Sequence, residues 1–282
     1  MKFSAAGSEV WIPDGANEAA ALQHVTHVAI GAHQDDVETM ALEGILACYR
    51  NPEKSFMAVI VTNGAGSPRS GPYADYTDEQ MQAVRRTEQK KAAFVGEYSA
   101  VAFLNYPSAA VKNSSDSGPK NDLKSVLSEV RPEVIYTHNL ADKHDTHIGV
   151  ALRTIEAIRE LPHDKRPAKL YGCQAWRDLD WLMDDDKVIF NVGGHENLAA
   201  SLIGVFDSQI AGGKRYDLAA PARRRAQATF HQSHSVDAAE MIDFAMDLTP
   251  LIQDDRLDPA EYIDRFIRRF AEDVRNKIRK FS

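Results

Sequence analysis

The sequence predicts an α/β protein with a mostly parallel sheet, helices on both faces and a C-terminal elaboration. Short runs rich in β-branched residues alternate with amphipathic stretches, which is the pattern of repeated strand–helix units. Right-handed crossovers between parallel strands place the connecting helices over both faces of such a sheet. With 282 residues, of which 44% are hydrophobic, the chain is long enough to bury a sizeable core.

Four apolar segments predict the central strands, and each is followed by a helical pattern. The strands are expected at 26–31, 56–62, 100–104 and 134–138, and the helices at 36–49, 78–95, 121–130 and 147–160. Thr77, with Gln80 three residues later, predicts a capping box at the start of the second helix. Pro132 and Pro162 end the third and fourth helices.

The pattern becomes less regular after residue 169. Strands are expected at 169–175 and 188–192, and helices near 196–209, 219–229 and 259–279. The last helix is amphipathic with a basic face, and we expect it to pack on the core with one solvated side. No clear linker interrupts the chain. We therefore interpret residues 1–282 as one domain, with a motif-bearing core at about 25–160 and a C-terminal elaboration at about 169–282.

Composition and charge exclude several classes of protein. A formal net charge of −8 argues against nucleic acid or an anionic membrane as the main partner. Cys48 and Cys173 lie far apart in apolar segments, and we interpret both as buried packing residues. Residues 1–16 lack the basic start and apolar core of a signal peptide, and no apolar run is long enough to span a membrane. We therefore expect a cytoplasmic, soluble protein.

Two clusters of potential metal ligands follow the first and fourth predicted strands. His33 and Asp36 are three residues apart across a strand-to-helix turn, so they can reach one metal ion from the same side. Asp35, next to Asp36, points elsewhere and can remain free. The second cluster contains His144 and His147. Because ligand sites in parallel sheets lie beyond the carboxyl ends of the strands, we expect both clusters at one edge of the sheet.

This combination of residues predicts a metal centre. Two histidines, one carboxylate and a position left for water form a known pattern for catalytic zinc. Bound zinc lowers the pKa of water to about 7 and polarises an amide carbonyl. A neighbouring free carboxylate can then accept the proton of the water as general base. Zn²⁺ is the expected cofactor, and Fe²⁺ or another divalent ion is the alternative.

Five ordered segments resemble those of the LmbE/PIG-L family of N-acetylglucosaminyl deacetylases. AHQDD at 32–36 is similar to the family's AHPDD, and HDTH at 144–147 is similar to its HPDH. TNG at 62–64, RRTE at 85–88 and FLNYP at 103–107 resemble its T-D-G, R-x-x-E and F-L-D-L-P segments. The resemblance covers about residues 25–158.

The resemblance implies a Rossmann-like fold, a zinc ion and hydrolysis of an N-acetyl group on a glucosamine-containing substrate. Carried over by motif position, it implies that the metal ligands are His33, Asp36 and His147. It also implies that Asp35 is the general base, and that His144 stabilises the oxyanion or protonates the departing amine.

Two positions depart from the family pattern. Gln34 replaces the usual proline, which relaxes the turn but leaves the ligands in place. Thr146 stands where the family usually has the Asp that orients the first histidine. We expect Asp145, or alternatively Asp142, to supply that catalytic carboxylate.

Other polar segments have less specific patterns. Arg85 is expected either to pair with Glu88, one helical turn later, or to bind the substrate as the family's helix motif implies. The Gly- and Ser-containing stretches at 64–76 and 107–119 are substrate loops or plain connections. The segment 207–216 folds over the pocket or is a surface loop.

The leading hypothesis is a zinc-dependent N-deacetylase that acts on an amino sugar or a glucosamine-containing conjugate. A metallohydrolase of a non-sugar amide or ester is an alternative, since the same centre would serve it. A non-catalytic sugar-binding protein is the alternative of another class, although a binder would have no use for Asp35 beside a metal. The expected partner is a small amino-sugar conjugate. Nucleic acid and membrane insertion are not expected, and a homo-oligomer is left open.

Overall fold

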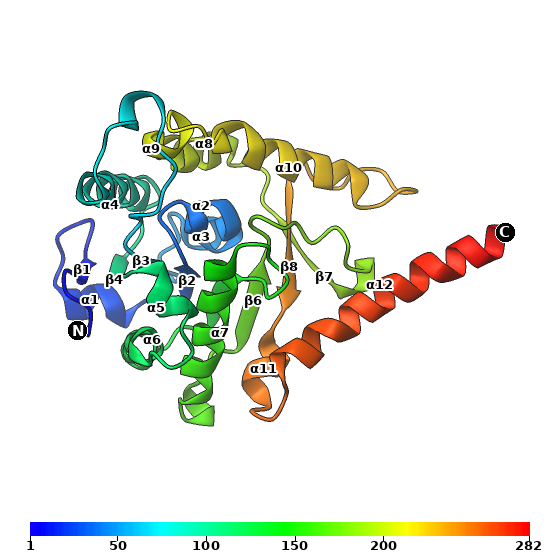
Figure 1. Ribbon diagram of the computed structural model, residues 1–282, viewed down its shortest axis with the longest axis horizontal. Coiled ribbons are helices and arrows are strands. Elements are labelled where there is room, and N and C mark those ends of the chain that lie inside the picture. Colours follow the sequence, from blue (N-terminus) through cyan, green and yellow to red (C-terminus); the bar gives the residue numbers. More distant parts are fainter.

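An eight-stranded sheet runs through the molecule in the computed structural model, which describes residues 1–282 (Figure 1). Its strand order is β1-β4-β3-β2-β5-β6-β8-β7. The five strands from β4 to β6 are parallel neighbours, whereas β1, β8 and β7 pair antiparallel at the two ends. The predicted α/β fold with a mostly parallel sheet is therefore confirmed. The strands are β1 Glu9–Trp11, β2 His27–Gly31, β3 Phe56–Thr62, β4 Ala100–Tyr106, β5 Val134–His138, β6 Lys169–Cys173, β7 Lys187–Asn191 and β8 Ile242–Asp247.

The order of the strands creates a topological switch point beside β2. The chain builds β3 and β4 on one side of β2 and then places β5 and β6 on the other side. The direction of winding therefore reverses between β2 and β5. In such sheets, ligands bind beyond the carboxyl ends of the two strands at the switch point. Both clusters of potential metal ligands follow these two strands.

Helices cover both faces of the sheet, as expected. One hydrophobic cluster includes Leu123 of α6 and Ile155 of α7, and the other includes Ile45 of α3, Ala93 of α4 and Leu202 of α8. The sheet separates these clusters, and its central strands are apolar toward both. The helices are α1 Glu18–Gln23, α2 Asp36–Met40, α3 Leu42–Cys48, α4 Asp78–Val95, α5 Ser108–Lys112, α6 Gly118–Val130, α7 Asp145–Arg159, α8 Glu196–Gly204, α9 Asp207–Ile210, α10 Tyr216–Phe230, α11 Thr249–Gln253 and α12 Pro259–Phe281.

The helix expected at 36–49 is interrupted, so that prediction is wrong. Ala41 leaves the helical region, with φ −119° and ψ 30°, and separates α2 from α3. The buried guanidinium of Arg224 donates hydrogen bonds to the carbonyl oxygens of Glu38 (3.2 Å) and Thr39 (2.9 Å). These carbonyls are therefore satisfied by α10 and do not require a continuous helix. In contrast, the predicted capping box of α4 is present.

The C-terminal part of the chain extends the same sheet. β6 pairs with β5, β8 pairs with β6, and β7 lies at the edge beside β8. The sequence pattern did not predict β8 or the short edge strand β1. The helix expected at 196–209 is divided into α8 and α9. Only the first part of α12 packs on the body, and the rest projects away from it (Figure 1). No helix has both the length and the low polarity needed to cross a bilayer.

Candidate metal centre and active site

The turn after β2 is held by its two neighbouring strands. The backbone N–H of Ala32 donates to Nε2 of His138, at the end of β5 (2.9 Å). The carbonyl oxygen of Ala32 accepts from the backbone N–H (2.9 Å) and the hydroxyl (2.7 Å) of Thr62, at the end of β3. Gln34, in the place of the family's proline, donates its side-chain amide to the carbonyl oxygen of Thr62 (3.3 Å). The turn is therefore anchored without a proline.

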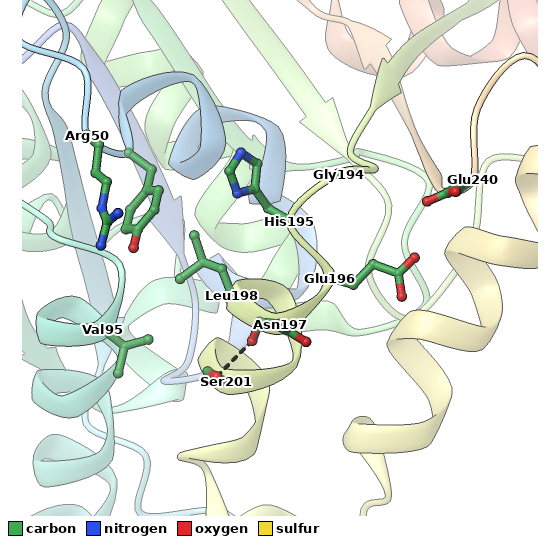
Figure 2. A pocket seen from close by; sticks show the side chains of 10 residues that line it. Arg50, Val95, Gly194, His195, Glu196, Asn197, Leu198, Ser201 and Glu240 are labelled. Carbon is green, nitrogen blue, oxygen red and sulfur yellow. Dashed lines mark hydrogen bonds between the residues drawn. The ribbon is translucent and has the colours of Figure 1, made fainter.

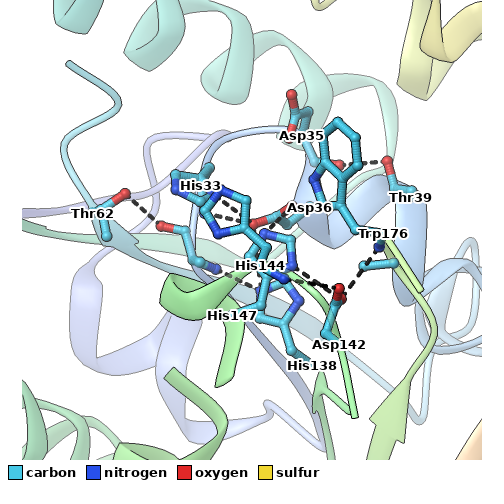
Figure 3. A network of polar contacts seen from close by, with 12 residues as sticks. His33, Asp35, Asp36, Thr39, Thr62, His138, Asp142, His144, His147 and Trp176 are labelled. Carbon is cyan, nitrogen blue, oxygen red and sulfur yellow. Dashed lines mark hydrogen bonds and ion pairs between the residues drawn. The ribbon is translucent and has the colours of Figure 1, made fainter. Parts of the chain in front are cut away.

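Three of the predicted ligands meet at the switch point between β2 and β5 (Figure 3). Nδ1 of His33 lies 3.2 Å from Oδ2 of Asp36, and Nε2 of His147 lies 3.4 Å from Oδ1 of Asp36. One ligand atom from each residue lies within 4.8 Å of the other two. Asp36 begins α2 and His147 lies in the first turn of α7, so two segments far apart in the chain converge here.

The hydrogen bonds of His147 suit it to hold a cation. Its Nδ1 lies 3.2 Å from Oδ2 of Asp142, while its buried Nε2 has no hydrogen-bond partner. A carboxylate at Nδ1 keeps the proton on that nitrogen, which leaves the lone pair of Nε2 directed at the carboxylate of Asp36. A buried acceptor facing an acidic oxygen is unfavourable unless a proton or a metal cation lies between them. Burial alone would lower the pKa of His147, but the carboxylates of Asp36 and Asp142 outweigh it and raise the pKa, so this position favours a positive charge. The residues therefore fit a divalent metal ion.

The charges of the centre reinforce this assignment. Burial alone would raise the pKa of Asp36, but the imidazoles of His147, His138 and His33 outweigh it and hold the pKa well below its ordinary value. Burial lowers the pKa of His33, although Asp36 opposes the shift. Asp36 is thus an anion and His33 a neutral imidazole, which are the forms that bind metal.

A second cluster of His138, Asp142 and His147 has the spacing of metal ligands but a different role. Nε2 of His138 accepts the N–H of Ala32, and its ring stacks on His147 with centroids 3.8 Å apart. Burial lowers the pKa of His138 to about 4, so it is neutral. The carboxylate of Asp142 already accepts hydrogen bonds from four backbone N–H groups and faces Nδ1 of His147. The four donors are Lys143, His144, Trp176 and Arg177. His138 and Asp142 therefore hold the turn after β2 and the ring of His147 in position, and do not form a separate metal site.

Asp35 lies beside the three potential ligands. The residue is buried, and its backbone adopts the left-handed conformation with φ 90°. Its Oδ2 accepts a hydrogen bond from Nη2 of Arg85 (3.0 Å). Burial raises the pKa of Asp35 to about 8, although the guanidinium of Arg85 opposes the shift. Arg85 also donates to the carbonyl oxygen of Gln34 and to the hydroxyl of Ser67. Arg85 thus contacts Asp35, and the expected ion pair with Glu88 is not present.

Glu88 has another partner. Its carboxylate accepts the backbone N–H (2.7 Å) and the hydroxyl (2.6 Å) of Ser208, which lies in α9. These bonds hold the segment 207–216 over α4. The segment therefore folds over the pocket rather than remaining a surface loop.

His144 faces the centre and Asp145 does not. The ring of His144 stacks on His147 with centroids 4.5 Å apart and lies edge-on to His33 at 5.1 Å. Its Nδ1 has no hydrogen-bond partner. Burial lowers its pKa, and the neighbouring His147 adds to the shift. Asp145 is exposed in the first turn of α7 and makes no hydrogen bond. Of the two carboxylates considered for orienting a histidine, Asp142 is the one in contact with this cluster.

A cavity of about 460 Å³ opens onto the centre. Both polar loops and the segment 207–216 contribute to its wall. Gly64 has a φ of 77°, and a Cβ there would lie 2.5 Å from the side-chain oxygen of Gln34, so another residue at this position would be strained. The lining residues are His33, Asp35, Asp36, Gly64, Gly66, Ser67, Pro68, Arg85, Ser108, Lys112, His144, Thr146, Trp176, Gln209, Lys214 and Tyr216.

A more open hollow of about 700 Å³ lies elsewhere on the molecule, at the ends of α3 and α4 (Figure 2). It contains one imidazole, His195, which lies edge-on to Tyr49 at 6.1 Å. Glu196 at its rim is paired with Arg225. No group of potential metal ligands lies in this hollow, so its size alone does not indicate a catalytic site.

The fold and the site can be compared with known proteins. Residues 28–158 match the model of the PIG-L family, described as GlcNAc-PI de-N-acetylase. A comparison with curated proteins finds no match to the chain.

Several solved structures share the fold. The conserved protein TT1542 from Thermus thermophilus has a TM-score of 0.62 and 14% identity, over 79% of this chain and 94% of that one. GalB, the 4-carboxy-2-hydroxymuconate hydratase from Pseudomonas putida, has a TM-score of 0.62 and 17% identity, over 79% and 96%. The N,N'-diacetylchitobiose deacetylase from Pyrococcus horikoshii has a TM-score of 0.61 and 14% identity, over 86% and 90%. At these identities the likeness concerns the fold alone. The family's own model matches residues 28–158, which contain the turn after β2 and the start of α7, so this part of the chain is similar to the PIG-L family of deacetylases.

Proposed function

We propose that this protein is a zinc-dependent N-deacetylase of an amino sugar or a glucosamine-containing conjugate. The observation that carries the proposal is the convergence of His33, Asp36 and His147, with the separate carboxylate of Asp35 beside them at the wall of a polar cavity. When bound by these three residues, a divalent cation polarises the amide carbonyl and lowers the pKa of water. Zinc is the proposed ion, and Fe²⁺ is the alternative.

Asp35 and His144 would carry out the two proton transfers of the reaction. Asp35, held by Arg85, accepts a proton from the attacking water as the new C–O bond forms. The imidazole of His144 stabilises the developing negative charge or gives a proton to the amine nitrogen as the C–N bond breaks. The products are a carboxylic acid and a free amine. Asp142 orients His147, and Asp145 has no part in this scheme.

The polar character of the cavity supports a hydroxylated amine as the leaving group. Ser67, Ser108 and Gln209 offer hydrogen-bonding groups, and Lys112 and Lys214 add positive charge. The P. horikoshii protein that shares this fold is a deacetylase of N,N'-diacetylchitobiose, an acetylated sugar.

The test is the release of acetate by the metal-loaded protein from N-acetylglucosamine conjugates and from simple N-acetyl amino acids. We expect turnover of the sugar conjugates. Preferential turnover of the amino acids would identify the alternative, a metallohydrolase of non-sugar amides. Binding of the sugar without release of acetate would identify a binding protein. Because GalB shares the fold, hydration of 4-carboxy-2-hydroxymuconate is a useful negative control.

A further inference from the structure

A second, smaller compartment adjoins the proposed reaction site. It has a volume of about 150 Å³ and shares Asp35 and Asp36 with the lining of the polar cavity. Its other walls are mainly small or apolar. The remaining lining residues are Thr39, Ala175, Trp176, Tyr216, Ala219, Ala220 and Arg223.

Trp176 and Tyr216 belong to the walls of both compartments. Their rings meet edge-on with centroids 6.4 Å apart. The backbone of Trp176 is fixed by a hydrogen bond to Asp142 (3.2 Å), and Nζ of Lys214 lies 4.5 Å from its ring centroid. The two aromatic side chains therefore lie between the polar and the apolar part of the space in front of Asp35.

The amide substrate of a deacylase has an apolar acyl chain on one side and a polar amine on the other. The two compartments differ in polarity in the same way. We propose, resting on the proposed deacylase function, that the apolar compartment binds the alkyl chain of the acyl group while the polar cavity binds the amine. A space of this size holds about five groups the size of water. The compartment therefore fits a linear acyl group of about four to six carbons better than acetyl alone. Each buried methylene should raise kcat/KM about fourfold, the equivalent of about 0.8 kcal/mol.

The test uses glucosamine carrying acetyl, butanoyl or hexanoyl groups, with the full-length metal-loaded protein. We expect kcat/KM to increase along the series in the wild type. Ala220→Leu, which fills the compartment, should lower the hexanoyl-to-acetyl ratio by about tenfold or more. Ala222→Leu adds the same side chain to the same helix at an exposed position outside the compartment and should leave the ratio unchanged.

A binding measurement separates this proposal from the proposed function. Calorimetry should show that hexanoate binds the wild-type protein more tightly than acetate does, and that Ala220→Leu removes the difference. Hydrolysis of the acetyl compound with no gain from longer chains would overturn the acyl compartment and leave the deacetylase intact. Failure to hydrolyse any of the amides would refute the proposed function, while hexanoate binding no tighter than acetate would refute the compartment.

A different observation concerns the projecting part of α12. Five large apolar side chains lie along one stripe of this helix and are 38–81% exposed. They are Ile267, Phe270, Val274, Ile278 and Phe281. The stripe is symmetric about Val274, because the others lie four and seven residues before and after it. An apolar stripe of about 20 Å, left uncovered along a helix, indicates an interaction surface.

We infer that a second copy of this chain covers the stripe in an antiparallel, two-fold arrangement centred on Val274. In that register Phe270 faces Ile278 of the other copy and Ile267 faces Phe281. Each of these contacts occurs twice, because a two-fold interface pairs the same surface of both copies. The charges agree with this register. Residues 275–282 carry four basic and no acidic side chains. They would lie next to the partner's acidic segment 184–186, where Asp186 already pairs with Arg269.

The oligomeric state of the full-length chain tests this inference. Sedimentation equilibrium should give a dimer for the wild type, a monomer for Val274→Asp and a dimer for Ala260→Asp. The last variant adds the same charge at an exposed position of the same helix, outside the stripe and the basic segment. Unchanged helical content by circular dichroism would show that the substituted helix still forms. A monomeric wild type would overturn the dimer. If that monomer bound vesicles containing phosphatidylglycerol and not vesicles of phosphatidylcholine alone, an anionic membrane would be the occupant instead.

Discussion

At the scale of single residues, the site depends on two adjacent carboxylates that face different partners. Asp36 contacts His33 and His147, whereas Asp35 is turned away by its positive φ and contacts Arg85. A non-glycine residue in this conformation costs about 1–3 kcal/mol and persists only where its surroundings hold it. The backbone strain at Asp35 therefore accompanies the different orientations of Asp36, the proposed metal ligand, and Asp35, the proposed base.

Asp35→Asn is expected to keep the bound metal and to lower kcat about 10²–10⁴-fold, because the amide cannot accept the proton. His33→Ala should lose both metal and turnover. Metal analysis of each purified variant, alongside its rate, distinguishes the two effects. Full turnover in Asp35→Asn would remove this residue as the base.

Arg85→Lys tests whether this arginine positions Asp35 or binds the substrate. Lysine keeps the charge but cannot contact Asp35, Gln34 and Ser67 together. If Arg85 acts through Asp35, kcat should fall about 10–100-fold with little change in KM. A rise in KM at constant kcat would instead indicate a direct contact with the substrate.

At the scale of secondary-structure elements, α10 holds the separate parts of the site together. Arg224 is 2% exposed and donates to two carbonyl oxygens of α2 and to Asp243 of β8 (2.9 Å). The same helix begins with Tyr216, which lines both compartments. The position of α10 therefore affects the backbone of α2 as well as the shape of the cavity.

Arg224→Met is expected to lower the free energy of unfolding by about 3–5 kcal/mol, because it leaves Asp243 buried without its cationic partner. The matched control is Arg225→Met, which breaks a largely exposed ion pair with Glu196 and should cost about 1 kcal/mol or less. Urea unfolding followed by circular dichroism measures both. Equal destabilisation of the two variants would contradict the structural role of Arg224.

At the scale of the whole molecule, the candidate metal site joins the two halves of the parallel sheet. His33 and Asp36 follow β2, and His147 follows β5. An ion bound by all three would be bound only by the folded chain, so binding and folding are coupled.

Addition of zinc to chelator-treated protein should therefore raise the midpoint of thermal unfolding. An excess of metal 100-fold above Kd stabilises the fold by about 2.7 kcal/mol. His147→Ala should abolish this rise, whereas Asp35→Asn should retain it. An equal rise in wild type and His147→Ala would show that the metal binds elsewhere.

The local sequence was sufficient to predict the central strands, the capping box of α4 and the proximity of the two ligand clusters. Strand periodicity and the carboxyl-edge rule depend on residues that are neighbours in the chain. The break in α2, the pairing of Arg85 with Asp35, the roles of His138 and Asp142, and the strand β8 depend on contacts between distant segments. Local patterns do not encode which buried donor reaches which acceptor. Only the packing of α4, α7 and α10 against the sheet decided those partners.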